Sequence, residues 1–220
     1  MCSGRIDLEF IFRAFFNGLD GVFIGGCKLG ECNYVTHGNY DALANTYLAK
    51  KMMVHLGLNP ERLKISFMSG ADGNLLADVT DEFTKKLKEL GPLGMSEGID
   101  PNRLKLKLQA TRNLIPFIRL MERERLRVPV KSHEAYKDFF ESSEIDSLFN
   151  DVFKDKLVLS EIMLLLQQKP LSTSEISKIL GLNPSDVSRH MNSSSRQGMV
   201  RYDQRQKRYC YALGQAQGAC

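Results

Sequence analysis

Residues 21–32 have the sequence Gly21-Val22-Phe23-Ile24-Gly25-Gly26-Cys27-Lys28-Leu29-Gly30-Glu31-Cys32, a short apolar run followed by a loop that carries two cysteines. Such an uninterrupted apolar run is typical of a strand buried on both faces of a parallel sheet. Helical and strand-like patterns alternate around it. We expect a further strand over residues 63–68 and helices over residues 6–17, 40–56 and 74–90. This alternation predicts an α/β fold with a parallel sheet.

The composition is that of an ordinary folded protein. The chain has 220 residues, of which 43% are hydrophobic and 25% are charged. These values exclude disordered, collagen-like and coiled-coil proteins. No stretch approaches the roughly 18 consecutive apolar residues of a membrane-spanning helix, and the first residues do not resemble a signal peptide. We therefore expect a soluble, cytoplasmic protein.

Cysteine usage and charge distribution narrow the possible chemistry. The chain has 5 cysteines, an odd number without the density of a secreted disulfide scaffold, so thiol chemistry or metal binding in a reducing compartment is the better interpretation. Residues 1–95 hold 10 Lys and Arg against 11 Asp and Glu, and residues 96–220 hold 20 against 15. The basic second half raises the question of a nucleic-acid or acidic protein partner without answering it.

Glycine and proline mark the expected organisation of the chain. Residues 91–100 are punctuated by both and indicate a boundary after an α/β domain over residues 1–95. A helical linker is expected over residues 96–155, in which Pro116 should kink a helix or start a second one. A winged helix-turn-helix is expected over residues 156–213, followed by a tail over residues 214–220.

The winged-helix prediction rests on caps, a turn and a hairpin that agree with one another. Ser172 offers a capped start to the second helix, and residues 181–184 form the turn. Asn183 can cap the third helix, with Pro184 at its first position. Two strands, over residues 199–202 and 208–213, should follow and be joined by a polar wing.

The two cysteines of the opening stretch lie after a strand, where open parallel sheets place their binding sites. Four residues separate Cys27 from Cys32, and Gly30 lets the loop turn, so both sulfurs could face one iron atom. From spacing alone, two buried structural cysteines or a redox disulfide explain the pattern equally well.

Several short motifs follow one another in order over residues 1 to about 93. They are Met1-Cys2-Ser3-Gly4-Arg5, residues 21–27, Gly30-Glu31-Cys32-Asn33-Tyr34, Gly38-Asn39-Tyr40, residues 57–62 and Ser69-Gly70-Ala71-Asp72-Gly73. Together these motifs resemble the delta subunit family of the methyl-viologen-reducing, non-F420-reducing hydrogenases. The winged helix would be an extension of that family's domain.

The resemblance implies a flavodoxin-like fold and a [2Fe-2S] cluster with Cys2, Cys27 and Cys32 among its ligands. It also implies a cytoplasmic electron-transfer subunit of an oxidoreductase complex, without a catalytic residue of its own. Such a subunit carries electrons from a hydrogenase or formate dehydrogenase module to the flavoprotein subunit of a heterodisulfide reductase.

The sequence departs from the family pattern in its first residues. A strand and helix with a C-x-x-C motif usually precede Cys-Ser-Gly-Arg and are absent, which leaves the fourth ligand open. Asn33 replaces a usual His, and Leu29-Gly30-Glu31 replaces Pro-Gly-Asp. The true start could lie upstream, another chain could supply the thiolate, or the cluster could have been lost. We expect an upstream start, because a sheet without this strand and helix would expose apolar surface.

Other candidate ligands are weaker. His37 could bind iron as histidines do in Rieske centres, but we expect an ordinary loop histidine. Cys210 lies in the predicted wing hairpin and Cys220 at the end of the chain, so neither is expected to be the missing ligand.

The exposed face of the third winged-helix helix and the wing could contact a macromolecule. The candidate residues are Ser185, Ser188, Arg189, Asn192, Arg196, Arg205, Lys207 and Arg208. Short polar side chains and arginines can contact base edges, and wing cations can contact phosphates. A docked protein explains the same face equally well. The alternative function is therefore a redox-responsive DNA-binding regulator.

Overall fold

The computed structural model describes residues 2–34 and 38–212 and divides into two compact units, Met1–Asp155 and Lys156–Cys220. Its mixed α/β class and its C-terminal winged helix confirm the predicted fold class. Within the described ranges, no helix has both the length and the apolar character needed to cross a membrane.

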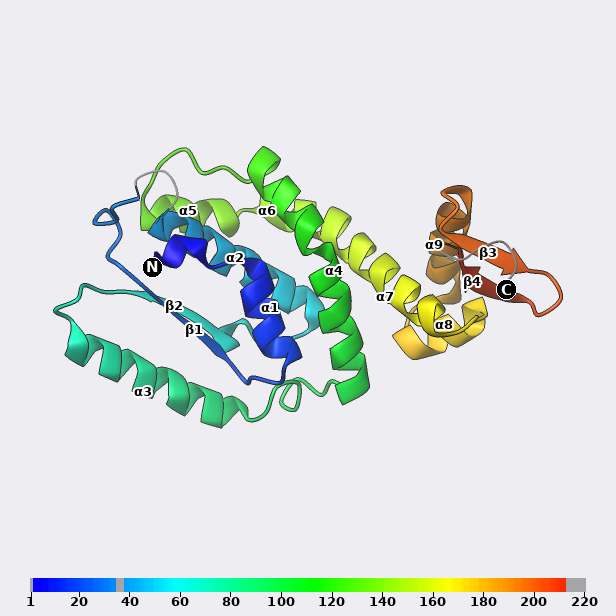
Figure 1. The fold of residues 1–220 in the computed structure, drawn as a ribbon, viewed down its shortest axis with the longest axis horizontal. Coiled ribbons are helices and arrows are strands. Elements are labelled where there is room, and N and C mark those ends of the chain that lie inside the picture. The colour runs from blue at the N-terminus through cyan, green and yellow to red at the C-terminus, as the bar shows by residue number, and fades with distance from the viewer. Residues whose placement is uncertain (1, 35–37, 213–220) are drawn as a thin grey trace. The chain divides into compact units, whose positions relative to one another are not determined.

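The core of the first unit is a pair of parallel strands with helices on both sides. Strand β1 (Val22–Gly26) pairs with β2 (Leu63–Phe67). Helices α1 (Leu8–Phe16) and α2 (Asn39–Leu56) lie on one side of the pair, and α3 (Gly73–Leu90) lies on the other (Figure 1). Ile24 is buried in the strand pair, whereas the neighbouring Phe23 contacts Phe83 of α3, with ring centroids 6.0 Å apart. Alternate residues of β1 thus pack against different helical layers.

Residues 101–154 form helices that pack onto this core. They are α4 (Pro101–Arg125), α5 (His133–Phe140), α6 (Ser143–Leu148) and the π-helix η3 (Phe149–Lys154). Arg112 of α4 forms an ion pair with Glu9 of α1 at 2.7 Å, and Phe140 of α5 stacks on Tyr47 of α2 at 5.5 Å between ring centroids. The segment expected as a linker is therefore part of the first compact unit.

Of the two outcomes expected at Pro116, a kink or the start of a second helix, the second does not occur. Helix α4 continues through Pro116, whose side chain is exposed, while Ile115 and Ile118 are buried on either side of it. Packing of the apolar face stabilises the helix on both sides of Pro116, which outweighs the one backbone hydrogen bond that proline removes.

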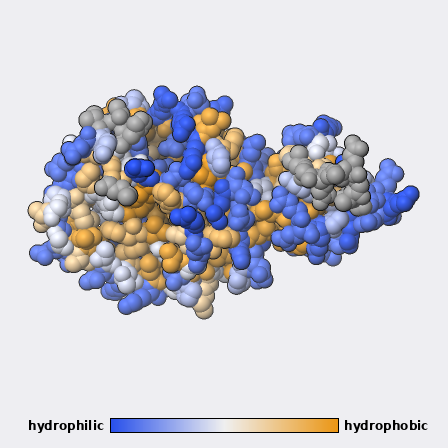
Figure 2. Space-filling model, in the orientation of Figure 1, coloured by the Kyte–Doolittle hydropathy of each residue, from blue (hydrophilic) through white to orange (hydrophobic). Residues whose placement is uncertain are grey.

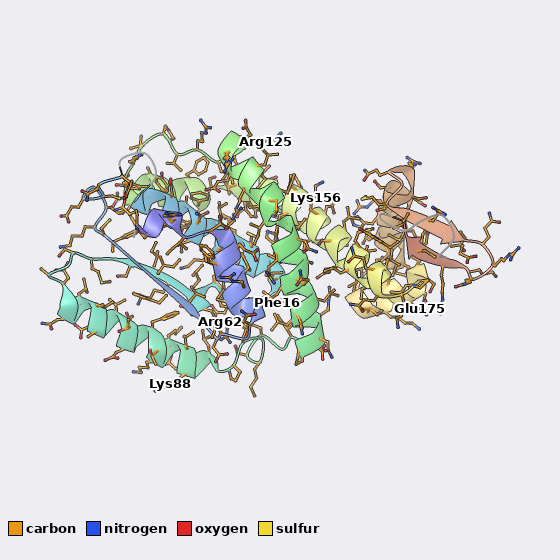
Figure 3. All side chains as sticks on the ribbon, in the orientation of Figure 1. Phe16, Arg62, Lys88, Arg125, Lys156 and Glu175 are labelled. Atoms are coloured by element: carbon orange, nitrogen blue, oxygen red, sulfur yellow. The ribbon has the colours of Figure 1, made fainter. Side chains whose placement is uncertain are left out.

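A buried ion pair fastens the segment between α3 and α4 to the strands. Arg62, at the end of the short helix η2 (Pro60–Arg62), is fully buried, and its Nε donates to Glu97 Oε1 at 2.7 Å. Its remaining donors bind Glu97 Oε2, Ser96 Oγ and the carbonyl oxygens of Asp20, Leu90, Gly91 and Pro92. Figure 3 shows Arg62 between the strands and this segment. The predicted domain boundary is thus held inside the first unit.

The second unit follows the predicted winged-helix pattern closely. Its elements are α7 (Asp155–Gln168), α8 (Thr173–Leu180), α9 (Pro184–Arg196), β3 (Val200–Asp203) and β4 (Arg208–Tyr211). Ser172 and Glu175 form a complete capping box, and Asn183 caps α9 with Pro184 at its first position. The antiparallel β3–β4 pair forms the wing. The expected helix start at residue 159 is too late, because α7 continues without a break from η3.

Candidate metal centre

Three free thiols lie at the carboxyl end of the parallel strand pair. Cys27 follows β1 directly, and Cys32 lies in the loop after it. Cys2 caps the short helix η1 (Ser3–Arg5), where its Sγ accepts a hydrogen bond from Gly4 N at 3.4 Å. The Sγ atoms of Cys2 and Cys32 are 3.8 Å apart, and Cys27 lies close enough to Cys32 to change its ionisation. The structure therefore brings together all three cysteines predicted to bind iron.

The sulfur spacing is that of a tetrahedral metal ion. With metal–sulfur bonds of about 2.3 Å, two neighbouring ligands are about 3.8 Å apart. Cys2 and Cys32 could bind one metal ion at their present separation. As they stand, no three or more His, Cys, Asp or Glu side chains among the described residues are placed to hold a metal ion. A two-iron cluster takes four protein ligands, so these three cysteines could provide at most three of them.

Asn39 fixes the loop that carries Cys27. It is the first residue of α2, and only 1% of its surface is exposed. Its Nδ2 donates to the carbonyl oxygens of Cys27 at 2.9 Å and Lys28 at 2.7 Å, and it lies 3.6 Å from Cys27 Sγ. The amide thus holds the first turn of α2 against the thiol loop.

Two glycines allow the segments that carry Cys2 and Cys32 to approach each other at the start of α2. A Cβ atom on Gly38 would lie 2.5 Å from Cys32 Sγ, and a Cβ atom on Gly4 would lie 2.4 Å from the Gly38 carbonyl oxygen. Both distances are shorter than any non-bonded contact allows, so no larger residue fits without movement of the backbone. Gly38 therefore leaves room for the Cys32 sulfur, and Gly4 leaves room for the Gly38 backbone.

The surroundings change the ionisation of two thiols in opposite directions. Partial desolvation raises the pKa of the Cys27 thiol above its ordinary value although the residue is exposed, and the neighbouring Cys32 raises it further. Backbone N–H groups of Tyr34 and Asn39 donate to Cys32 Sγ and lower its pKa. Cys32 is therefore the more readily ionised of the two, as a metal-binding thiolate requires.

A salt bridge joins the two loops at the carboxyl ends of the strands. Lys28, in the thiol loop, lies 3.0 Å from Asp72, in the loop after β2. The backbone N–H of Ser69 and the Lys28 ammonium lower the pKa of Asp72 to about 2. This pair remains charged at neutral pH beside the exposed Cys27.

One hydroxyl beside the thiols has no hydrogen-bond partner among the described residues. Ser3 Oγ is buried, and a Cβ atom on Gly26 would come within 3.0 Å of it. The three thiols and this unpartnered donor fit a sulfur-rich anionic group. Sequence reasoning gave Ser3 and Asn39 no role, although both lie in motifs that carry the family resemblance. His37 and Cys220 lie outside the described residues.

The candidate contact residues of the winged helix lie on α9 and the wing. Most of them are exposed, namely Ser185, Arg189, Asn192, Arg196, Arg205 and Lys207. Ser188 and Arg208 are half-buried. Hydrophilic residues cover the wing at the right of Figure 2. The exposed face is thus polar, as expected from the sequence.

Three of these side chains already have partners within the unit. Ser185 Oγ donates to Asn183 Oδ1 at 3.0 Å, Arg189 lies 3.8 Å from Asp186, and Arg208 forms an ion pair with Glu175 at 2.7 Å. Glu175 also belongs to the capping box of α8, so Arg208 fastens β4 to that helix. Arg208 is therefore better placed to stabilise the wing than to contact a partner.

The chain thus combines a small α/β domain that carries three free thiols with a winged helix. Residues 1–91 match the family model described as methyl-viologen-reducing hydrogenase, delta subunit, and residues 160–202 match the model described as bacterial regulatory protein, arsR family. The chain belongs to the family of methyl-viologen-reducing hydrogenase delta subunits, which confirms the resemblance stated above.

The relatives that the chain matches are named as subunits of hydrogenases or heterodisulfide reductases. The chain is 46% identical over 91 residues to an F420-non-reducing hydrogenase iron-sulfur subunit of Archaeoglobus profundus, a match that covers 41% of this chain and 66% of the relative. It is 40% identical over 92 residues to a hydrogenase iron-sulfur subunit of Methanopyrus kandleri, or 42% of this chain and 69% of the relative. It is also 40% identical over 94 residues to one of the CoB-CoM heterodisulfide reductase subunits of Methanosarcina acetivorans, or 43% of this chain and 12% of the relative. The chain thus spans about two thirds of the length of the hydrogenase subunits.

Proposed function

We propose that the first unit is an iron–sulfur electron carrier in which Cys2, Cys27 and Cys32 bind a [2Fe-2S] cluster. The observation that carries this proposal is the convergence of three free thiols at the carboxyl end of the strand pair, with Cys2 and Cys32 at metal-ligand spacing. The name of the Archaeoglobus relative, an iron–sulfur subunit, supports it. A fourth ligand comes from outside this trio.

The proposed role is outer-sphere electron transfer, in which the group takes up one electron and passes it on. Cys27 is the exposed member of the trio, so a redox partner can approach the site from its side. The donor would be a hydrogenase or formate dehydrogenase module, and the acceptor a heterodisulfide-reductase-type flavoprotein. The names of the relatives support a hydrogenase and a heterodisulfide reductase as partners. The formate dehydrogenase module and a cytoplasmic location belong to the proposal through the family resemblance alone.

Iron content tests the carrier directly. After anaerobic reconstitution we expect about two irons and two acid-labile sulfides per chain and an EPR signal that appears only on reduction with dithionite. Cys2→Ser and Cys32→Ser should each abolish the signal, because each removes a thiolate of the pair at metal-ligand spacing. Ser194→Ala, on α9 of the other unit, should leave it unchanged. Absence of iron from the reconstituted wild-type protein contradicts the proposal.

A second candidate function is DNA binding by the winged helix, which would make the chain a redox-responsive regulator. The exposed cations of α9 and the wing favour it, and so does the match to a family described as regulatory. The turn between β3 and β4 is ordered by Asp203, whose Oδ1 accepts from the backbone N–H groups of Arg205 and Gln206. The cations of the wing are therefore presented on a defined turn.

Salt dependence tests this second function. We expect the affinity for duplex DNA, measured by fluorescence anisotropy, to fall by orders of magnitude between roughly 50 and 200 mM salt, as for roughly 6–10 phosphate contacts. The double substitution Arg205→Gln/Lys207→Gln should lower the salt slope by about 2, since each cation accounts for about one contact. Lys85→Gln/Lys88→Gln, on exposed positions of α3, provides the charge-matched control. Equal losses for both double variants, or no binding at low salt, exclude DNA as the partner.

A further inference from the structure

The hydroxyl of Ser3 is the one polar feature of the thiol site that the described structure leaves without a function. Ser3 Oγ is buried and has no hydrogen-bond partner among the described residues. Ser3 follows Cys2 in the chain, and its Oγ lies against Gly26, the residue before Cys27. The hydroxyl therefore sits between two of the segments that carry the thiols.

A buried hydroxyl without a partner is costly, because it has lost its hydrogen bonds to water and gained none in return. Buried polar groups in folded proteins nearly always have a partner, so each exception calls for a missing acceptor. The neighbouring Cys2 Sγ already accepts a hydrogen bond from Gly4 N. An acceptor that arrives with a bound group would satisfy the Ser3 hydroxyl.

We propose that Ser3 donates a hydrogen bond to a sulfur atom of the group held by Cys2, Cys27 and Cys32, and so tunes its reduction potential. This inference rests on the proposed iron–sulfur function. A donor to cluster sulfur stabilises the reduced state, which carries one more negative charge, and so raises the potential. Removal of the hydroxyl should lower the potential and weaken retention of the cluster.

Ser3→Ala removes only the hydroxyl oxygen, so its effect can be compared between the iron-free and the iron-loaded protein. In the iron-free protein the melting temperature should stay the same or rise, since an unsatisfied group is lost. In the iron-loaded protein it should fall, the midpoint potential should become more negative, and iron should be lost to a chelator roughly tenfold faster, as expected for a hydrogen bond to a charged group. The opposite signs in the two states identify a bond made only to the bound group.

Ser194 provides a matched control. Its Oγ is also buried without a hydrogen-bond partner among the described residues, but it lies on α9 of the other unit. Ser194→Ala should therefore change the melting temperature equally in both states and leave the potential unchanged. If wild-type protein binds iron and Ser3→Ala behaves as Ser194→Ala does, the role of Ser3 is excluded while the carrier stands. If wild-type protein binds no iron, both proposals fail.

Discussion

Replacement of Glu97 by Ala is expected to lower the free energy of unfolding by about 3–5 kcal/mol, the usual cost of removing one partner of a buried ion pair. The Arg62 side chain is completely buried and that of Glu97 is 6% exposed, so the remaining guanidinium would have no access to water. Two of its nitrogens would lose their charged partner at 2.7 and 3.1 Å. Chemical denaturation of the full chain, followed by circular dichroism, measures the loss.

Two variants establish that burial causes this loss. Arg62→Met/Glu97→Leu removes both charges and should recover part of the stability, because no unpaired charge remains. Lys86→Gln breaks the ion pair between Lys86 and Glu61, whose side chains are 40% and 56% exposed, and should leave the denaturation midpoint unchanged. An equal loss for Lys86→Gln and Glu97→Ala would contradict the role of the buried pair.

The Glu97 carboxylate should also make the free energy of unfolding fall at low pH. Burial by itself raises the pKa of Glu97, but hydrogen bonds from Arg62, the Asn59 N–H and Ser96 outweigh this effect and lower the pKa to about 2. The folded pKa lies below the ordinary value of 4.5, so the contribution of Glu97 is fully present above pH 4.5 and is lost as the pH falls towards 2. The stability of Glu97→Gln should vary less over this range.

Local patterns predicted the secondary structure well because each depends on a few neighbouring residues. Strand β1, the Ser172–Glu175 capping box and the Asn183–Pro184 start of α9 all form where expected, although Ile24 alone of β1 is buried. In contrast, burial of Arg62 depends on carbonyl oxygens 28–30 residues further along the chain, which no local pattern reveals. Glycine and proline in residues 91–100 therefore predicted a domain boundary, whereas in the fold this segment is bound to Arg62.

In the candidate site, too, residues close together in the sequence could be predicted, whereas contacts between distant residues could not. Cys27 and Cys32 could be singled out from their spacing and from the strand before them. Cys2 lies 30 residues from Cys32, and only the family resemblance connected it to the pair before the structure placed the two sulfurs 3.8 Å apart. Asn39 had no chemical signal at all, because a buried amide that binds two carbonyl oxygens is recognised only from their positions.

Asn39→Ala is expected to release the thiol loop as well as to destabilise the fold. The substitution leaves the carbonyl oxygens of Cys27 and Lys28 without their donor, which should lower the free energy of unfolding by about 1–3 kcal/mol. Without this clamp, Cys27 should move more freely away from Cys32. We expect faster alkylation of Cys27 by iodoacetamide in the iron-free protein, measured by mass spectrometry, and lower iron retention after reconstitution.

Asn45, on the same helix, provides a control that distinguishes release of the thiol loop from general destabilisation. Asn45 Nδ2 donates to the Ile6 carbonyl oxygen at 2.9 Å, on the segment that leads into α1 and away from the loop of residues 27–32. Asn45→Ala should therefore also reduce stability but leave the alkylation rate of Cys27 unchanged. If both variants accelerate alkylation equally, the effect comes from lower overall stability. If only Asn39→Ala does so, the amide of Asn39 holds Cys27 in place through its hydrogen bonds to the Cys27 and Lys28 carbonyl oxygens.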